Sequence, residues 1–168
     1  VPIIITSLRP PAELVEAAHS YGGLVYHDVI NVRHAKKAVE QGVDGLILVC
    51  AGAGGHAGAL SPFALLREVK DWFDGTIILS GSIGDGYSVA SAITLGADFA
   101  YLGTRFIATK EANADREYKK MLEDLMALLP GASAGQNWVD DQFIQVLLDI
   151  CDKDQSGGIE PNEMKCAT

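Results

Sequence analysis

Short apolar runs alternate with helical stretches along roughly the first 129 residues of the chain. Runs rich in Val, Ile and Leu predict five strands, at Val1–Thr6, Leu24–Ile30, Gly45–Val49, Thr76–Ser80 and Phe99–Leu102. Strands this short, apolar on both faces and separated by single helices, are typical of a parallel sheet built from βαβ units. The pattern therefore predicts an α/β fold with about five βα units.

The predicted helices fill the segments between these strands, and Gly or Pro residues mark their limits. Helices are expected over 10–20 and 32–41, and a third begins after Ser61-Pro62. A fourth follows Gly81–Gly86 and ends at about Leu95, and a last helical region runs from Gly103-Thr104 to about Leu129. Residues 130–137 contain the run Pro-Gly-Ala-Ser-Ala-Gly, which is typical of a linker. After it, Trp138–Cys151 has its apolar residues on one helical face.

Residues 152–163 match the calcium-binding loop of an EF-hand. Such a loop needs side-chain oxygens at positions 1, 3, 5 and 12, and a backbone carbonyl at position 7. The residues at these positions are Asp152, Asp154, Ser156, Glu163 and, for the carbonyl, Gly158. An acidic surface turn would explain the carboxylates but not their spacing. The sequence predicts a Ca²⁺ site here, in a single EF-hand over 138–168 whose exiting helix is truncated.

Composition and charge limit the classes of molecule that the chain is expected to bind. The chain has 168 residues, 48% of them hydrophobic and 21% charged, with a net charge of −9, as in soluble globular proteins. Residues 138–168 hold seven acids and two lysines, so −5 of that charge lies there. This balance disfavours nucleic acid and anionic membrane. No apolar run approaches the roughly 20 residues that span a bilayer. Three cysteines without paired spacing indicate a reducing compartment, so we expect a cytoplasmic protein.

Two glycine-rich loops follow the fourth and fifth predicted strands, where parallel α/β folds bind ligands. They are Gly81-Ser82-Ile83 and Gly103-Thr104-Arg105. Glycine at a helix N-terminus lets backbone N–H groups approach a phosphate, and Thr104 can add a hydroxyl donor. Arg105 either pairs with phosphate or forms a surface ion pair. Each loop alone could be a plain tight turn, but the pair predicts a phosphate site.

A histidine stands in the glycine-rich loop after the third predicted strand. His56 follows Gly54 and Gly55, so its imidazole is expected to face an open pocket. Histidine can take a proton from a weak carbon acid near neutral pH; the alternative is a histidine that only orders its loop. His27 and Asp28 also stand at the carboxyl end of a strand and could line the same cavity. Asp98 is expected to form a turn before the fifth strand.

With these motifs the chain resembles the nitronate monooxygenase family, from about Val1 to Asp124. The matching segments are Gly42-Val43-Asp44-Gly45, Ala53-Gly54-Gly55-His56-Ala57-Gly58, Gly81-Ser82-Ile83 and Gly103-Thr104-Arg105-Phe106. The resemblance implies a TIM barrel that holds non-covalent FMN, with the FMN phosphate on the loops at Gly81–Ile83 and Gly103-Thr104. It also implies that His56 abstracts the α-proton of a nitroalkane, that dioxygen reoxidises the flavin, and that a carbonyl compound and nitrite are released.

The resemblance further implies how much of a barrel is present. Counted back from the phosphate loops, the chain supplies strands four to eight, so residues 1–129 are expected to form an incomplete TIM-type barrel. An open sheet leaves edges and apolar surface to cover. We therefore expect a homo-oligomer or a missing barrel half. Two alternatives stay open: an FMN-dependent enoyl-acyl-carrier-protein reductase, and a non-catalytic calcium-binding scaffold protein.

Overall fold

The computed structural model of the chain describes residues 1–54 and 58–127. The chain divides into two compact units, and each is described by itself. The first comprises Val1–Ile83 and Ser91–Tyr101, and the second comprises Gly84–Ala90 and the chain from Leu102 onward. The predicted linker, the helix at 138–151 and the calcium loop all lie outside the described residues, as do the predicted domain limits at 129 and 137.

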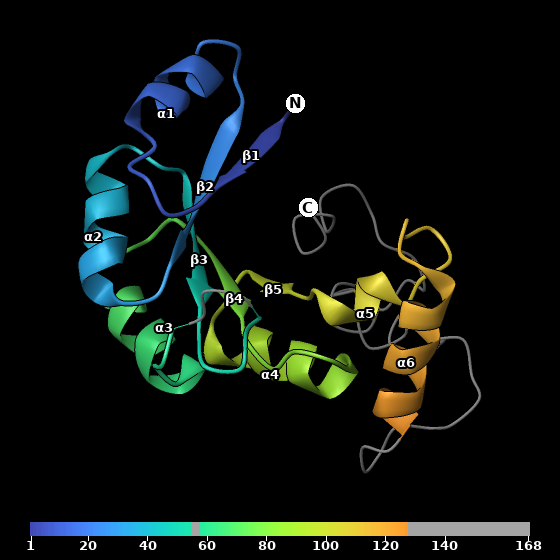
Figure 1. Ribbon diagram of the computed structural model, residues 1–168. Helices are drawn as coiled ribbons and strands as arrows, with labels where there is room; N and C mark the ends of the chain where they lie inside the picture. The colour runs from blue at the N-terminus through green and yellow to red at the C-terminus, as the bar shows by residue number, and fades with distance from the viewer. Residues whose placement is uncertain (55–57, 128–168) are drawn as a thin grey trace, which may run out of the picture. The chain divides into compact units, whose positions relative to one another are not determined.

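A five-stranded parallel sheet forms the centre of the first unit (Figure 1). Its strands follow one another in chain order: β1 (Ile3–Thr6), β2 (Leu24–Val29), β3 (Gly45–Val49), β4 (Thr76–Ser80) and β5 (Phe99–Tyr101). Every neighbouring pair is parallel. The predicted parallel α/β fold is confirmed, and the predicted strand limits agree with the observed ones to within two residues.

The middle strand explains why the strands carry continuous apolar runs. In β3, Leu46 lies opposite His27 of β2 and Ile77 of β4. Leu46, Ile47 and Leu48 are each 0% exposed, although successive side chains of a strand point to opposite faces. Both faces of the sheet are thus covered at its centre, which is the environment that selects unbroken Val, Ile and Leu runs.

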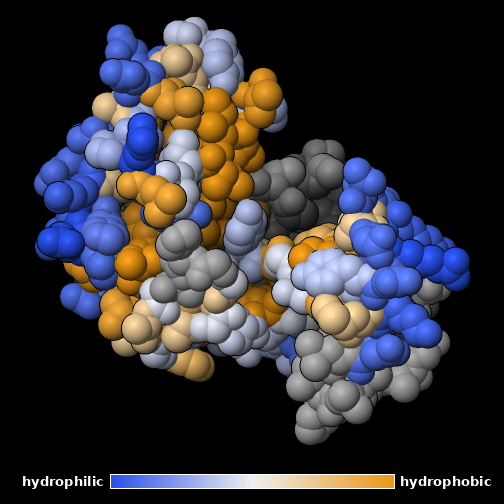
Figure 2. All heavy atoms as spheres, viewed as in Figure 1, coloured by the Kyte–Doolittle hydropathy of each residue, from blue (hydrophilic) through white to orange (hydrophobic). Residues whose placement is uncertain are grey.

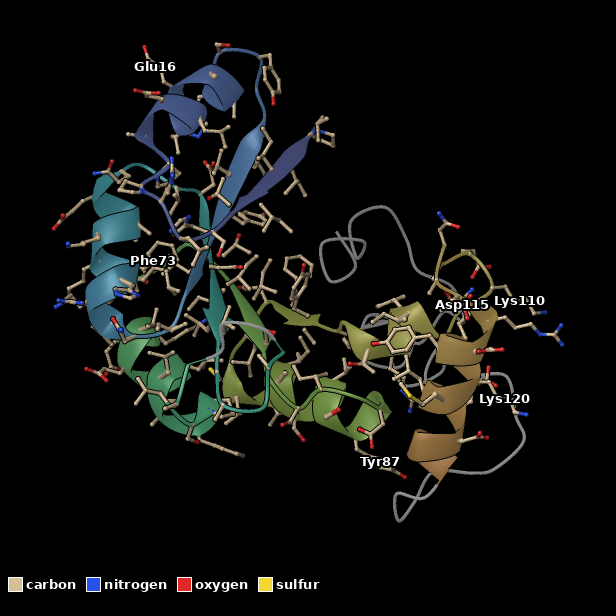
Figure 3. The ribbon with its side chains drawn as sticks, in the orientation of Figure 1. Glu16, Phe73, Tyr87, Lys110, Asp115 and Lys120 are labelled. Carbon is tan, nitrogen blue, oxygen red and sulfur yellow. The ribbon has the colours of Figure 1, made fainter. Side chains whose placement is uncertain are left out.

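Helices α1 (Ala12–His19), α2 (Val32–Glu40) and α3 (Pro62–Lys70) pack along one face of this sheet (Figure 1). The main hydrophobic core lies between them and the strands, and Phe73, labelled in Figure 3, belongs to it. The starts of α2 and α3 are marked by residues at the helix ends themselves. Asn31 caps α2 by accepting a hydrogen bond from the His34 amide at 2.9 Å, and α3 begins at Pro62, whose missing N–H costs nothing at a first helical position.

The opposite face carries a smaller cluster of Tyr26, Ile47 and Ile78, to which none of the described helices contributes. Hydrophobic side chains remain exposed on it, including Ile5, which is 48% exposed (Figure 2). A doubly wound sheet would carry helices on both faces. Sequential strand order with helices on one face is instead the winding of a β/α barrel. That these strands are four to eight of such a barrel stays a prediction.

Two aspartates join helices to strands in the same way. Asp44 donates its amide to the Val25 carbonyl at 2.9 Å, and its carboxylate accepts the Val25 amide at 2.7 Å. Asp98 repeats this with Ile77, at 2.8 Å for both bonds. Each aspartate comes two residues after a left-handed glycine that ends a helix, Gly42 or Gly96. The turn role predicted for Asp98 agrees with this geometry.

The second unit differs from the sequence prediction in one respect. The continuous helical region expected from Gly103 to about Leu129 is wrong, because α5 (Thr104–Ile107) and α6 (Arg116–Ala127) are separate. Asp115 starts α6 by accepting the Glu117 amide at 2.8 Å. Lys119 donates to the carbonyls of Thr109 and Ala112 at 2.7 and 2.6 Å. Side-chain bonds to backbone compete with the helix in this connection, and Figure 3 shows Lys110 and Asp115 beside the first turn of α6.

We expect Asp44→Ala to lower the free energy of unfolding by about 1–3 kcal/mol, because the Val25 amide would lose its partner. Urea unfolding followed by circular dichroism measures this change. The matched control is Asp74→Ala, at an exposed carboxylate, for which we expect a change within about 0.5 kcal/mol. Equal effects of the two substitutions would contradict the role given to Asp44.

Candidate active site

Three loops meet at the carboxyl edge of the sheet in the first unit. The loop after β3 returns along its own strand, with the Gly58 amide donating to the Val49 carbonyl at 3.0 Å. It also reaches the loop after β4, where the Ser82 amide donates to the Gly52 carbonyl at 3.2 Å. Since parallel strands all end at this edge, the loops that follow them can form one surface.

Glycine is required where the β3 and β4 loops cross. Gly52 has φ +88°, and a Cβ built on it would lie 1.8 Å from the Ser82 Oγ. Gly81 has φ +132°, and its Cβ would lie 2.8 Å from the Ala51 carbonyl oxygen. A side chain at either position would combine a disfavoured backbone with a steric clash. The two loops are therefore held in backbone-to-backbone contact.

The far end of the β3 loop rests against the end of β2. A Cβ on Gly58 would lie 3.0 Å from the Ile30 Cβ and 2.7 Å from the Val49 carbonyl oxygen. Both described ends of the loop, 51–54 and 58–60, thus stay near the carboxyl edge. Of the residues that the sequence singled out in this loop, Gly54 is described, whereas Gly55 and His56 lie outside the described residues.

Backbone strain gathers at the same edge. Leu8 and Ser82 are the non-glycine residues with positive φ in the described part of the chain, at +69° and +56°. Leu8 follows β1 and Ser82 follows β4. Left-handed conformations of such residues cost free energy and cluster at functional sites. Sequence inspection missed both, because neither residue type marks a left-handed turn.

His27 and Asp28, which the sequence grouped together, lie on opposite faces of β2. His27 shares the helix-covered face with Val25 and Val29, and its Nδ1 lies 2.7 Å from the Thr6 Oγ1. It is 8% exposed, and burial lowers the pKa of its imidazole, so the ring is neutral near pH 7. His27 therefore belongs to the core side of the sheet rather than to a ligand cavity.

Asp28 lies on the other, helix-free face. Its Oδ1 is buried and has no hydrogen-bond partner among the described residues. Burial raises the pKa of Asp28, while a hydrogen bond from the Ser7 side chain and the charge of His27 act in the opposite direction. The net effect makes the neutral form of Asp28 easier to populate than that of an exposed aspartate. Which of two adjacent residues lies on the helix-free face depends on the strand register, and the sequence alone did not show it.

The predicted phosphate loops fall in different units. In the first, Ile83 packs against the main core, and the Ser82 amide is already bonded to the Gly52 carbonyl. In the second, Gly103 directly precedes Thr104 and Arg105 of α5. Their joint use in one phosphate site stays a prediction.

At the start of α4 (Gly86–Leu95), side chains of the chain itself occupy the first backbone donors. Asp85 accepts the Ser88 amide at 2.8 Å, and the Ser88 Oγ accepts the amides of Gly84 and Asp85 at 3.0 and 3.1 Å. These bonds from Ser88, helped by the charge of Arg105, lower the pKa of Asp85. Arg105 donates from its Nε to the Gly84 carbonyl, and its expected role toward a phosphate stays a prediction. The Asp-x-x-Ser spacing was the sequence signal for this cap.

Open backbone remains available for a ligand. At Gly54, Gly84 and Gly103, no described heavy atom comes within 4 Å of the position where a Cβ would stand. A phosphate could approach the main chain closely at these points, as a mononucleotide such as FMN requires. Each of these glycines is by itself compatible with contact to the phosphate of that cofactor, and their joint use stays a prediction.

Neither a metal site nor a membrane-spanning helix is found in the described part of the chain. No group of three or more His, Cys, Asp or Glu side chains gathers there as a metal ion would need. No described helix is both long and apolar enough to cross a bilayer. The predicted calcium ligands Asp152, Asp154, Ser156, Gly158 and Glu163 lie outside the described residues.

Comparison with known proteins identifies relatives of this chain. Residues 1–127 match the family described as nitronate monooxygenase. The nitronate monooxygenase of Neurospora crassa is 32% identical over 119 residues, covering 66% of this chain and 32% of that protein. A 1-oxo-octahydro-1H-indene-4-carboxyl-CoA dehydrogenase of Rhodococcus jostii is 32% identical over 113 residues, covering 67% of this chain and 32% of that protein. The chain thus spans about a third of the length of these curated relatives.

Solved structures agree with the fold. FabK from Thermotoga maritima superposes with a TM-score of 0.66 at 29% identity, covering 71% of this chain and 39% of that one. Nitroalkane oxidase from Streptomyces ansochromogenes gives a TM-score of 0.67 at 27% identity, covering 76% and 40%.

We expect Gly52→Ala to lower the free energy of unfolding by about 2 kcal/mol or more, since it adds a clash with Ser82 to a strained φ. Urea unfolding measures the effect. Gly84→Ala is the control, because a methyl group there meets no described atom within 4 Å. If Gly52→Ala proves as stable as Gly84→Ala, the loop crossing does not have the tight geometry described.

Proposed function

Because the chain belongs to the nitronate monooxygenase family, we propose that it forms the phosphate-side part of an FMN-dependent enzyme that oxidises nitroalkanes or nitronates. The products would be a carbonyl compound and nitrite. The observation that carries the proposal is the family match over residues 1–127. This range includes every glycine-rich loop at the carboxyl edge of the sheet.

The geometry of the first unit supports this function. The loops after β2, β3 and β4 converge at one edge, with Gly52 and Gly81 allowing two of them to touch. Parallel α/β proteins bind their ligands at this edge. The described ends of the loop after β3 are held at this edge, at Gly52 and Gly58.

The residues proposed to hold FMN are those of the glycine loops: Gly54, Gly55, Gly81, Ser82, Ile83, Gly103, Thr104 and Arg105. When bound, FMN supplies the redox chemistry, with dioxygen as the terminal electron acceptor. The chain supplies position and acid–base function. Backbone amides near the open glycines would hold the phosphate, and the bond from Arg105 to Gly84 would stiffen the turn beside it.

His56 is the proposed base. The α-proton of a nitroalkane must leave before electrons can pass from carbon, and a neutral imidazole can accept it. A nitronate has already lost that proton, so its oxidation needs no base. The two substrates therefore separate the role of His56 from the roles of the cofactor loops.

We expect His56→Asn to reduce kcat/KM for nitroethane by about 10²- to 10⁴-fold, the usual contribution of a general base. Turnover of ethyl nitronate and the amount of bound flavin should stay close to those of the unsubstituted protein. Nitrite release and the flavin absorbance measure these quantities, with His34→Asn as the control. A purified chain that is colourless and takes up no added FMN would contradict the flavoprotein assignment for this chain.

A flavin enzyme acting on a thioester is the second candidate. It is favoured by relatives named carboxyl-CoA dehydrogenase in Rhodococcus jostii and Mycobacterium tuberculosis, and it includes the enoyl-acyl-carrier-protein reductase alternative. Bleaching of the flavin by NAD(P)H, followed by its recovery on addition of an enoyl thioester, would select this candidate. Nitrite release from nitroalkanes without such recovery would select the first.

We also propose that residues 152–163 bind Ca²⁺, on the strength of their sequence pattern. Calorimetric titration of the full chain with CaCl₂ should give a heat of binding that Asp152→Ala abolishes, because that substitution removes the first ligand of the loop. Asp74→Ala, at an exposed carboxylate between α3 and β4, serves as the control. Calcium binding without any flavin chemistry would favour the scaffold alternative, and identical heats for the Asp152→Ala variant and the unsubstituted chain would rule out the site.

A further inference from the structure

Asp28 is a half-buried acid that the proposed chemistry leaves without a task. It stands near the end of β2, and its Oδ1 is buried without a hydrogen-bond partner in the described part of the chain. Buried polar atoms nearly always have a partner, so an exception needs an explanation. A core carboxyl with a purely structural role would bond to backbone amides, as Asp44 and Asp98 do here.

The side chains around Asp28 are mostly apolar, with one further polar group. Asp28 lies on the helix-free face beside Ile47, its partner in the sheet register, and next to the cluster of Tyr26, Ile47 and Ile78. Ser80, a buried polar residue, lies on the same face near the end of β4. An apolar surface with a few polar groups at its rim is the usual composition of a small-molecule site.

The loop that carries position 56 also comes close in space to the end of β2, which holds Asp28. Gly58 packs against Ile30, two residues beyond Asp28. The carboxyl group and the end of the histidine loop therefore share the carboxyl edge of β2 and β3. A substrate held near that loop would lie within reach of this part of β2.

The protonation state decides what Asp28 can bind. Burial favours the neutral carboxyl, because its charged form loses hydration. A neutral carboxyl can donate one O–H hydrogen bond, which an ionised one cannot. It would also leave an anionic ligand unrepelled, so oxygen acceptors suit this face better than cations.

We propose that Asp28 is a substrate-positioning acid whose O–H donates a hydrogen bond to an oxygen of a planar nitro or nitronate group. This inference deepens the proposed function and rests on it for the identity of the substrate. The hydrogen bond moves no proton: it orients the group and offsets its negative charge. Ionised Asp28 would repel the same oxygens.

Four other titratable groups bear on the pH dependence of such binding. His27 lies next to Asp28 in the chain but on the core face, and His34 on α2 acts on His27. Tyr26 shares the face of Asp28. His56, the proposed base, would attract anions when protonated, so it would also tighten anion binding at low pH. The experiment must separate His56 from Asp28.

Nitrate is a suitable probe, because it is planar, carries its negative charge throughout the working range and needs no turnover. We expect calorimetric titration of the full chain with sodium nitrate to show affinity falling about tenfold per pH unit once Asp28 ionises. In Asp28→Asn the amide still donates, so binding at low pH should persist and this part of the pH dependence should vanish. Asp28→Val should bind about tenfold more weakly at low pH. Sodium chloride at the same ionic strength controls for non-specific anion effects.

His56→Asn and Asp74→Asn are the matched controls, and both should keep the Asp28-dependent fall in affinity. A pH profile that persists in Asp28→Asn but vanishes in His56→Asn would overturn the proposal, as would absence of nitrate binding at any pH. Circular dichroism checks that the near-isosteric Asp28→Asn is folded, so the comparison stands even if Asp28→Val is not. FMN uptake is measured separately, so a failure of the flavin assignment is distinguishable from a failure of the Asp28 assignment.

Discussion

The burial of β3 on both faces is the constraint on which the first unit depends. Leu46 and Leu48 face the helices, Ile47 faces the other way, and all three are fully buried. The strand has parallel neighbours on both sides, β2 and β4, in a fixed register. Because the strands run in the same direction, the loops after β2, β3 and β4 all emerge at one edge. The candidate site is therefore a consequence of how the core is packed.

At that edge, an unfavourable backbone conformation accompanies close contact between two loops. Ser82 adopts a left-handed conformation that costs free energy in a non-glycine residue, yet its amide gains a bond to the Gly52 carbonyl. The absence of a side chain at Gly52 and Gly81 lets the loops approach so closely that no atom fits between them. Loops held in this way lose little further entropy when a ligand binds.

The two faces of β2 carry polar residues in different environments. His27 is neutral and paired with Thr6 under the helices, so it contributes to the core. Asp28, one residue later, carries a buried oxygen without a partner on the opposite face. In the second unit, the Asp85 carboxylate is likewise hydrogen-bonded, to Ser88, whereas no described atom crowds the backbone at Gly103. Unsatisfied or open groups, rather than charged ones as such, indicate where a ligand would be accommodated.

Local pattern was sufficient for much of this molecule. Apolar runs and glycine stops in the sequence determined the five strands, their parallel arrangement and the helices between them, because burial on both faces leaves a direct trace in residue type. The glycine motifs likewise indicated the family that residues 1–127 match. Tertiary structure alone decided the separation of α5 from α6, the opposite placement of His27 and Asp28, and the bond from Arg105 to Gly84. The placement of His27 and Asp28 depends on strand register, and the Arg105 bond on a contact between residues far apart in the chain. The break between α5 and α6 depends on side-chain bonds to nearby backbone. None of these leaves a periodic signal in a sequence.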